Sequence, residues 1–322
     1  MLSNLLFLIK LIRVLKKYNV LILINKNIRF KFLFIFFTNF ISIGVSYDRN
    51  HKNKSDGLRI AQALNELGPS FVKLGQLIST RPDIVGNTIA EDLSLLRDNL
   101  PPFSKKTAIE IIEDEFGTNI DNVFSQFSEP IAAASIAQVH FAKIKSSNTE
   151  IDVAVKVLRP EIEKIINQEM ERLEWLTTFM ENFTEFQRLR PNSIIKKAKE
   201  VIKFELDLRY EAAAASELSE NTNMDESFYV PKVYWDKVTQ KILTMEKIIG
   251  VPADKIDELN EKKVNKKQAA ENLIINFLRQ SIRDGYFHAD LHQGNLFLNP
   301  KGKLLAVDFG IMGRLDKKNR SY

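Results

Sequence analysis

The most informative segment of the chain lies near its end and reads His288-Ala289-Asp290-Leu291-His292-Gln293-Gly294-Asn295. An aspartate and an asparagine five residues apart in a loop can share one site, where the carboxylate orients a nucleophile and the amide oxygen binds a metal. Two histidines in an HxxxH pattern could also indicate zinc, but no third ligand is apparent. We expect His288 and His292, like His140 upstream, to have structural roles.

Two other segments extend this pattern. Asp308-Phe309-Gly310 follows a predicted strand over 304–307, and a carboxylate at a strand end is a common place to hold Mg²⁺ against phosphates. Val153-Ala154-Val155-Lys156 lies in a predicted strand over 151–158, which can direct one lysine into a cleft. Either segment alone is weak, since a strand-end lysine is usually just solvated. The three segments in this order argue against coincidence.

Periodicity places these segments within a mixed chain. Apolar spacing predicts helices over 58–67, 69–80, 90–97, 107–116, 161–186, 194–218 and 269–283. Alternation predicts strands over 131–144, 151–158, 229–233, 241–245, 296–298 and 304–307. Turn residues separate the first two strands at 145–149, and Gly117 and Gly285 are placed as helix caps.

Together the segments resemble the protein-kinase set of strand lysine, catalytic loop and metal-binding DFG. The resemblance implies that Lys156 holds the α- and β-phosphates and pairs with a helix carboxylate, Glu211 first and Glu205 second. Asp290 would occupy the catalytic-base position, while Asn295 and Asp308 would coordinate Mg²⁺. The hinge would be Met245-Glu246-Lys247, whose backbone groups, those of Glu246 among them, could hold adenine.

The departures from ordinary kinases are more diagnostic. The Gly-rich loop is replaced by Ile131-Ala132-Ala133-Ala134-Ser135-Ile136-Ala137-Gln138-Val139, whose Cβ atoms limit the approach of backbone to phosphates. His-Ala-Asp replaces His-Arg-Asp. Ordinary kinases have no place for Lys73-Leu74-Gly75-Gln76 or Glu205-Leu206-Asp207. With Gly68-Pro69-Ser70-Phe71-Val72-Lys73, this set resembles the UbiB/AarF/ADCK family of atypical kinases from about Leu58 onward, and loop 134–140 is similar to its bacterial members.

The resemblance implies an α+β fold of the two-lobed protein-kinase type with a family-specific helical extension. We expect a basic apolar arm over 1–47, the extension with its Lys73 motif over 48–128, an N-lobe with inserted helices over 129–247 and a partial C-lobe over 248–322. Family members continue further and bacterial ones usually end in hydrophobic helices, so the C-lobe is expected to be truncated.

Lys73 and Gln76 share one face of the predicted helix, and Gly75 permits close packing there. The family resemblance implies that this face covers the nucleotide cleft and regulates it, with Glu205 or Asp207 as the partner of Lys73. On a continuous helix over 194–218, Asp207 and Glu211 would share a face whereas Glu205 and Asp207 would not. The alternative is that these residues form ordinary solvated helix faces.

Charge is concentrated at the N-terminus. The chain of 322 residues carries a net charge of +5. Its first 47 residues hold seven bases and no acid, which leaves 39 bases against 41 acids in the rest of the chain. This balance poorly supports nucleic-acid binding.

The longest apolar run, 32–45, is shorter than the roughly 20 residues that span a bilayer. A basic, Phe-rich segment instead indicates contact with an anionic membrane surface, and packing on the globular body is the alternative. The chain contains no cysteine, which excludes Cys-based zinc and redox sites.

The family resemblance implies a role in making or maintaining ubiquinone. Our leading hypothesis is an atypical kinase or ATPase that uses ATP (or ADP) and Mg²⁺ at the bacterial cytoplasmic membrane and does not phosphorylate proteins generally. Its partners would be membrane lipids, quinone intermediates and ubiquinone-biosynthesis enzymes. A pseudokinase scaffold that binds nucleotide is the alternative. A true protein or small-molecule kinase comes third, disfavoured by the Ala-rich loop and the Lys73 motif.

Overall fold

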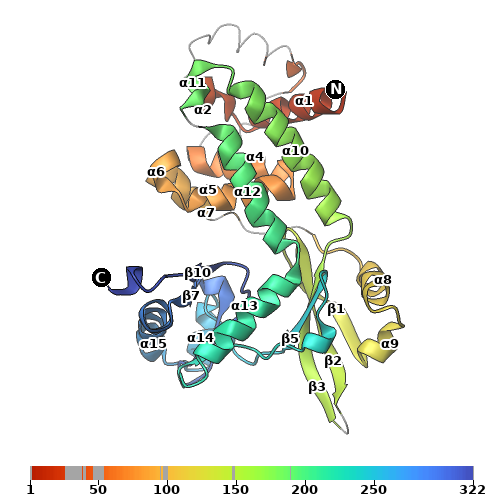
Figure 1. The fold of residues 1–322 in the computed structure, drawn as a ribbon, viewed down its shortest axis with the longest axis vertical. Helices are drawn as coiled ribbons and strands as arrows, with labels where there is room; N and C mark the ends of the chain where they lie inside the picture. The colour runs from red at the N-terminus through yellow and green to blue at the C-terminus, as the bar shows by residue number, and fades with distance from the viewer. Residues whose placement is uncertain are drawn as a thin grey trace. The chain divides into compact units, whose positions relative to one another are not determined.

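The computed structural model describes residues 2–25, 38, 41–45, 54–94, 96, 101–146, 149–188 and 190–321. The chain forms two compact units that are interleaved in sequence (Figure 1). The first contains Met1–Pro101, Ala133–Ile136 and Glu161–Lys203, and the second contains Pro102–Ala132, Ala137–Pro160 and Phe204–Tyr322.

The first unit is mainly helical where it is described. Gly68 separates α4 from α5 with φ at +129°, a conformation that requires glycine. Its helices are α1 Leu2–Lys17, α2 Leu21–Asn25, α4 Asp56–Leu67, α5 Pro69–Ser79, α6 Pro82–Val85, α7 Asn87–Ser94, α10 Ile162–Met180, α11 Thr184–Gln187 and α12 Pro191–Glu205, the last of which ends in the second unit.

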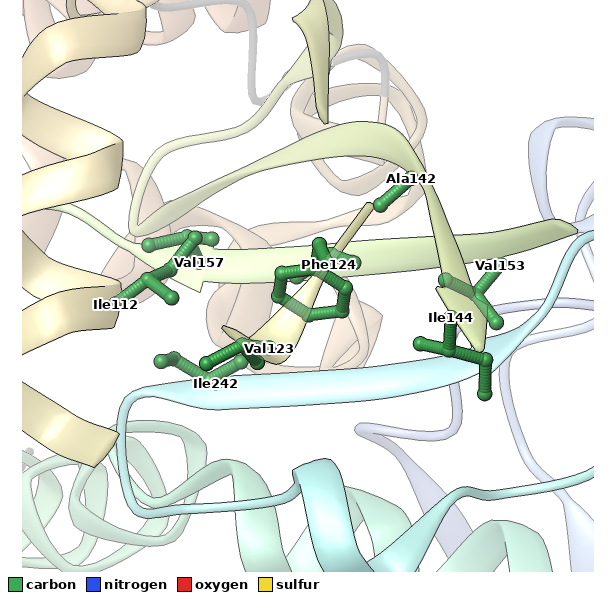
Figure 2. Packing of buried hydrophobic residues seen from close by; sticks show 9 residues of the cluster. Ile112, Val123, Phe124, Ala142, Ile144, Val153, Val157 and Ile242 are labelled. Carbon is green, nitrogen blue, oxygen red and sulfur yellow. The ribbon is translucent and has the colours of Figure 1, made fainter. Parts of the chain in front are cut away.

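The second unit begins with a sheet in the order β1-β2-β3-β5, in which β3 is antiparallel to both neighbours. Its strands are β1 Gln126–Ala133, β2 Ala137–Ser146, β3 Thr149–Leu158 and β5 Ile242–Glu246. Helices α8 Lys105–Phe116 and α9 Ile120–Val123 supply Ile112 and Val123 to a buried cluster with the sheet (Figure 2). Because strand side chains alternate, a core on one face leaves the other face for a site.

Helix α13 Leu208–Asn221 contacts β5, and the remaining elements form two small sheets and several helices. One sheet has the order β4-β9-β8-β6, and the other pairs β7 with β10. These strands are β4 Phe228–Tyr229, β6 Val251–Pro252, β7 Tyr286–His288, β8 Leu296–Leu298, β9 Leu304–Ala306 and β10 Met312–Arg314. The helices are α14 Ile256–Glu261, α15 Lys266–Leu278, a π-helix η3 Arg279–Asp284, and the 3₁₀ turns η2 Trp235–Lys237, η4 Gln293–Asn295 and η5 Asn319–Ser321.

Most predicted elements are confirmed, including the left-handed caps at Gly117 and Gly285. Two predictions were wrong because a short polar or small-residue segment interrupts an apolar pattern. The strand over 131–144 is a hairpin, since 134–136 connect β1 to β2. The helix over 194–218 breaks after Glu205, where the Asp207 carboxylate caps α13 by accepting a hydrogen bond from the Arg209 backbone N–H.

Smaller differences concern element ends. The helix predicted over 161–186 breaks after Met180, and the strand predicted over 229–233 is confined to 228–229, with Val233 forming a single bridge to Met245. Helix α7 begins at Asn87 and ends at Ser94, so the predicted end at Arg97 lies outside the described residues. The centre of the turn at 145–149 also lies outside them.

Part of the basic arm packs within the first unit. Helix α1 buries Phe7, Ile12 and Val14, and the Phe7 ring stacks on Phe71 at 6.1 Å between centroids. Lys17 pairs with Glu66 of α4 at 2.6 Å. On this face, α1 therefore packs against the globular body, which is the alternative to membrane contact. Leu2, Leu5 and Leu6 are exposed. The apolar run over 32–37 lies outside the described residues, and among those described no helix has the length and hydropathy of a bilayer span.

Candidate active site

Lys156 is positioned by the alternation of β3. Val153, Val155 and Val157 belong to the buried cluster on one face of the sheet (Figure 2 labels the first and last). Lys156 lies between two of them and therefore projects from the opposite face. There its partner in register is Leu243 of β5, while Ala154 is opposite Met245.

Glu211 lies in the first turn of α13 and pairs with Lys156. The Lys156 Nζ atom is 2.9 Å and 2.8 Å from the two oxygens of the Glu211 carboxylate. The two side chains are 15% and 8% exposed, so the ion pair is largely removed from water. Burial disfavours the charged form of Lys156, but the carboxylates of Asp308 and Glu211 outweigh this effect and raise its pKa above the ordinary lysine value. The first-choice partner from the sequence is thus the one observed.

Asp308 approaches the same lysine from the segment after β9. Its Oδ2 atom is 3.5 Å from Lys156 Nζ, and half of its side chain is exposed. Asp308 has φ at +62°, a left-handed conformation uncommon outside glycine, and its Oδ1 accepts a hydrogen bond from the Gly310 N–H at 3.2 Å. The next residue, Phe309, is buried, and its N–H donates to Glu211 Oε1 at 3.4 Å. Local backbone geometry thus directs the Asp308 carboxylate toward Lys156.

Asp290 and Asn295 form a second pair in the loop after β7. The Asn295 amide nitrogen donates to both Oδ2 and the backbone oxygen of Asp290, each at 3.1 Å. Because its nitrogen is used in this way, the oxygen of Asn295 is the atom that would bind a cation. His292 lies 3.6 Å from the same Asp290 oxygen, and the Asp290 side chain is 40% exposed.

The imidazole of His288 connects the Asp290 loop to the Asp308 segment. Its Nδ1 accepts a hydrogen bond from the Asp290 N–H at 3.1 Å, and its Nε2 donates to the Asp308 carbonyl at 2.8 Å. These roles assign the neutral ring with its proton on Nε2. Burial lowers the pKa of His288, which favours this neutral form. Two backbone hydrogen bonds also join these segments: the Val307 N–H donates to the Asn295 carbonyl at 3.0 Å, and the Ala289 N–H donates to the Ile311 carbonyl at 3.1 Å.

The site therefore offers one cation and several oxygen donors from segments far apart in sequence. Lys156 supplies a buried positive charge for an anionic ligand, and Glu211 orients that charge. Asp308 and the oxygen of Asn295 are hard donors of the type that Mg²⁺ prefers, so the donor set fits magnesium. Asp290 supplies a partly exposed carboxylate that can accept a proton or orient a hydroxyl group.

Glu205 and Asp207 differ in their relation to this site. Glu205 is close enough for its charge to contribute to the raised pKa of Lys156. Asp207 instead pairs with Arg209 at 2.6 Å, and this contact lowers the pKa of the Asp207 carboxyl. The predicted shared face of Asp207 and Glu211 was wrong, because Asp207 precedes α13 as its cap.

Two residues expected at the nucleotide have their hydrogen bonds directed elsewhere. The Glu246 carboxylate accepts from the Tyr229 hydroxyl at 2.5 Å, and the Glu246 N–H donates to the Lys232 carbonyl at 2.8 Å. Gln138, buried in β2, accepts from the Phe103 N–H at 2.9 Å and lies 2.8 Å from His140 Nε2. A backbone N–H of this hinge that donates a hydrogen bond to adenine would therefore belong to a residue other than Glu246.

The remaining predicted residues are distributed over both units. Of the Ala-rich stretch Ile131–Val139, Ala133–Ile136 belong to the first unit and the flanking residues to the second.

Lys73 and Gln76 lie on α5 in the first unit, where Gln76 donates to the Leu96 carbonyl at 3.4 Å. A Cβ on Gly75 would lie 2.5 Å from Leu96 and 2.6 Å from Leu64, which confirms that glycine permits close packing there. The regulatory role of Lys73 stays a prediction.

Sequence reasoning missed Gln280, which is fully buried in η3 and accepts a hydrogen bond from the His288 N–H at 3.2 Å. The signal that could have found it is a polar residue at the inward face of an apolar helix just before the loop that holds Asp290.

Comparison with known proteins agrees with this geometry. Residues 95–322 match the model of the ABC1 atypical kinase-like domain. A probable protein kinase UbiB of Pseudomonas paraeruginosa (strain DSM 24068 / PA7) is 40% identical over 272 residues, which cover 83% of this chain and 50% of that relative. The corresponding protein of Pseudomonas putida (strain W619) is 40% identical over 280 residues, covering 85% of this chain and 51% of its own. The chain thus spans about half the length of the curated relatives it matches.

A solved structure is also similar. The complex of Rv3197 with erythromycin from Mycobacterium tuberculosis matches with a TM-score of 0.56 and 26% identity, covering 75% of this chain and 59% of that one. The kinase-like fold expected from the sequence is therefore confirmed.

Proposed function

Because the chain belongs to the ABC1 atypical kinase family, we propose that it binds ATP with Mg²⁺ and hydrolyses it or transfers its phosphoryl group. The observation that carries this proposal is the meeting of Lys156, Glu211 and Asp308, with Asp290 and Asn295 tethered to them through His288. Phosphoryl transfer depends on positioning and charge more than on covalent chemistry, and this arrangement supplies both.

Each residue has a distinct part in the proposed reaction. Lys156 would contact the phosphates, while its contact with Glu211 keeps the ammonium in place. Asp308 and Asn295 would hold Mg²⁺, which when bound neutralises charge on the phosphate oxygens. Asp290 would orient the attacking hydroxyl or water and receive its proton. Water is the acceptor if the activity is hydrolysis alone.

We further propose that this activity supports ubiquinone biosynthesis at the bacterial cytoplasmic membrane. The similarity to proteins named UbiB supports this role. The exposed Leu2, Leu5 and Leu6 on the basic helix α1 support contact with an anionic lipid surface. Membrane lipids, quinone intermediates and ubiquinone-biosynthesis enzymes would then be its partners.

The test is ATP turnover by the wild-type chain and by Asp308→Asn and Asp290→Asn variants. Asp257→Asn, an exposed carboxylate on α14, is the matched control. The proposal expects Mg²⁺-dependent turnover that both site variants abolish and the control keeps. Nucleotide binding without turnover in the wild type would favour a pseudokinase scaffold, and efficient phosphorylation of a generic peptide would favour an ordinary kinase.

The cellular role has a separate test. Cells lacking the gene are expected to lose ubiquinone and to regain it with the wild-type copy but not with an Asp290→Asn copy. Unchanged quinone content in the deletion strain would contradict a role in ubiquinone biosynthesis while leaving the ATP site intact.

A further inference from the structure

Helix α15 and η3 carry amides on their inward face. Asn272, Asn276 and Gln280 are spaced four residues apart and are 8%, 1% and 0% exposed. Large apolar residues are exposed on the same two elements: Ile274, Ile275, Phe277, Leu278 and Ile282. Surface helices ordinarily bury their apolar side, so the buried amides need a specific explanation.

Each buried amide joins the helix to a different segment. Asn272 donates to the Gly302 carbonyl at 2.8 Å, and Asn276 donates to the Ser227 hydroxyl at 2.9 Å. These two bonds attach α15 to the residues just before β9 and β4. Gln280 instead accepts from the His288 N–H at 3.2 Å. Among the three, Gln280 is thus the amide that reaches the catalytic segment.

Gln280 holds both ends of the strand that precedes the catalytic loop. Its backbone carbonyl accepts the Gly285 N–H, a bond of the π-helical type, while its side chain accepts the His288 N–H. β7 begins directly after Gly285 and ends at His288. The π-helical turn thereby sets the place at which His288 enters the site.

The amide nitrogen of Gln280 is buried and has no hydrogen-bond partner within the described part of the chain. A buried donor without a partner destabilises the folded chain, and leucine or methionine at this position would avoid that destabilisation. The Gln280 oxygen offsets this destabilisation, because it accepts the hydrogen bond of the buried His288 N–H.

We propose that Gln280 is a positioning residue that fixes the His288 backbone and, through the His288 ring, the spacing of Asp290 and Asp308. The ring contacts the Asp290 N–H and the Asp308 carbonyl at once. A shift of the His288 backbone would therefore break one or both of these bonds. The part of this inference that concerns catalysis rests on the proposed function; the part that concerns His288 does not.

Three substitutions at Gln280 separate its oxygen from its bulk. Gln280→Met keeps the length and removes the acceptor, whereas Gln280→Glu keeps an oxygen at the same place. Gln280→Asn keeps the amide but shortens it, and it replaces the methionine variant if that variant does not fold. Asn276→Leu is the control, because it removes a buried amide of the adjoining helix α15 that does not contact His288.

Two readouts are needed. Selective ¹⁵N labelling of the four histidines reports the His288 tautomer, and steady-state kinetics with MgATP separates kcat from KM. Gln280→Met is expected to lose the single Nε2–H signature of His288 and to lower kcat about 10- to 100-fold, with little change in KM. Gln280→Glu is expected to retain both properties, and Asn276→Leu to lower Tm while retaining both.

The proposal is overturned if Gln280→Met keeps the His288 signature, or if Asn276→Leu loses it to the same extent. It is also overturned if wild-type kcat is measurable and Gln280→Met leaves it unchanged. A wild-type chain without turnover would refute the proposed function, and the histidine spectrum would still decide whether Gln280 fixes His288.

Discussion

Lys156 and Glu211 are 55 residues apart in sequence, yet the lysine Nζ lies within 2.9 Å of both oxygens of the glutamate carboxylate. The strand β3 supplies one charge and the first turn of α13 supplies the other. Asp308, a further 97 residues along the chain, adds a second carboxylate at 3.5 Å. Three separate segments of one unit thus place their charges together around one ammonium group.

Removing the lysine is expected to destabilise the second unit. Lys156→Met leaves the Glu211 carboxylate buried without its cation, which costs about 3–5 kcal/mol of unfolding free energy. Glu211→Gln in the same chain removes the uncompensated charge and is expected to recover much of this loss. Denaturant unfolding of the wild type, both single variants and the double variant measures the coupling, and strictly additive effects would show that the two groups do not interact.

Gly285 is expected to be required for the turn into β7. It has φ at +69°, and a Cβ there would lie 2.7 Å from the Leu315 carbonyl oxygen. Gly117 is the matched control, because its φ is +62° and nothing lies within 4 Å of its Cβ position. Gly117→Ala should cost about 1 kcal/mol from backbone strain alone, and Gly285→Ala clearly more. Equal losses of Tm would contradict the steric argument.

Stability is expected to fall in mild acid because of His140. Burial lowers the pKa of His140, although the Ser128 carbonyl and Glu129 act in the opposite direction and Lys105 adds to the lowering. The unfolded chain therefore binds a proton more readily, so the contribution of the neutral ring is complete above about pH 6.5 and is lost as the pH falls toward the folded-state pKa.

One such group gives a slope of up to about 1.4 kcal/mol per pH unit in that window. His140→Phe keeps a ring against Phe127, whose centroid is 4.4 Å from that of His140, and removes the titration. Unfolding free energies between pH 5 and 8 should show a shallower slope in this variant than in the wild type. An identical slope would assign the acid sensitivity to other groups.

Asp207 is expected to act on helix stability through its capping bond. Its side chain accepts from the Arg209 N–H at 3.1 Å, so Asp207→Ala should cost about 1 kcal/mol. Asp207→Asn keeps a capping oxygen and is expected to retain most of the stability while losing the ion pair with Arg209. Thermal unfolding distinguishes the two, and equal destabilisation by both would indicate that the ion pair matters more than the cap.

The sequence predicted the parts of the site that depend on local pattern. Alternation in β3 was enough to direct Lys156 away from the core, and a carboxylate after β9 was enough to locate Asp308. Partner choice also succeeded for Glu211. The motifs predict where these side chains lie because strand and loop geometry is largely set by neighbours in sequence.

What the sequence could not predict depends on breaks and on buried polar contacts. Apolar periodicity continues across Glu205 and Asp207, so nothing marked the break in which Asp207 caps α13. The commitment of Gln138 to Phe103 joins residues 35 apart, and the contact of Gln280 with His288 uses a π-helical turn. Such contacts are set by tertiary packing, which periodicity does not record.

Whether Lys156, Asn295 and Asp308 bind MgATP can be determined from an experimental structure of the chain with a non-hydrolysable ATP analogue and Mn²⁺ in place of Mg²⁺, with the metal located by its anomalous scattering. We expect a metal bound by the Asp308 carboxylate and the Asn295 oxygen, with phosphate oxygens in contact with Lys156 Nζ. A nucleotide bound elsewhere, or a metal that contacts neither Asp308 nor Asn295, would contradict this expectation.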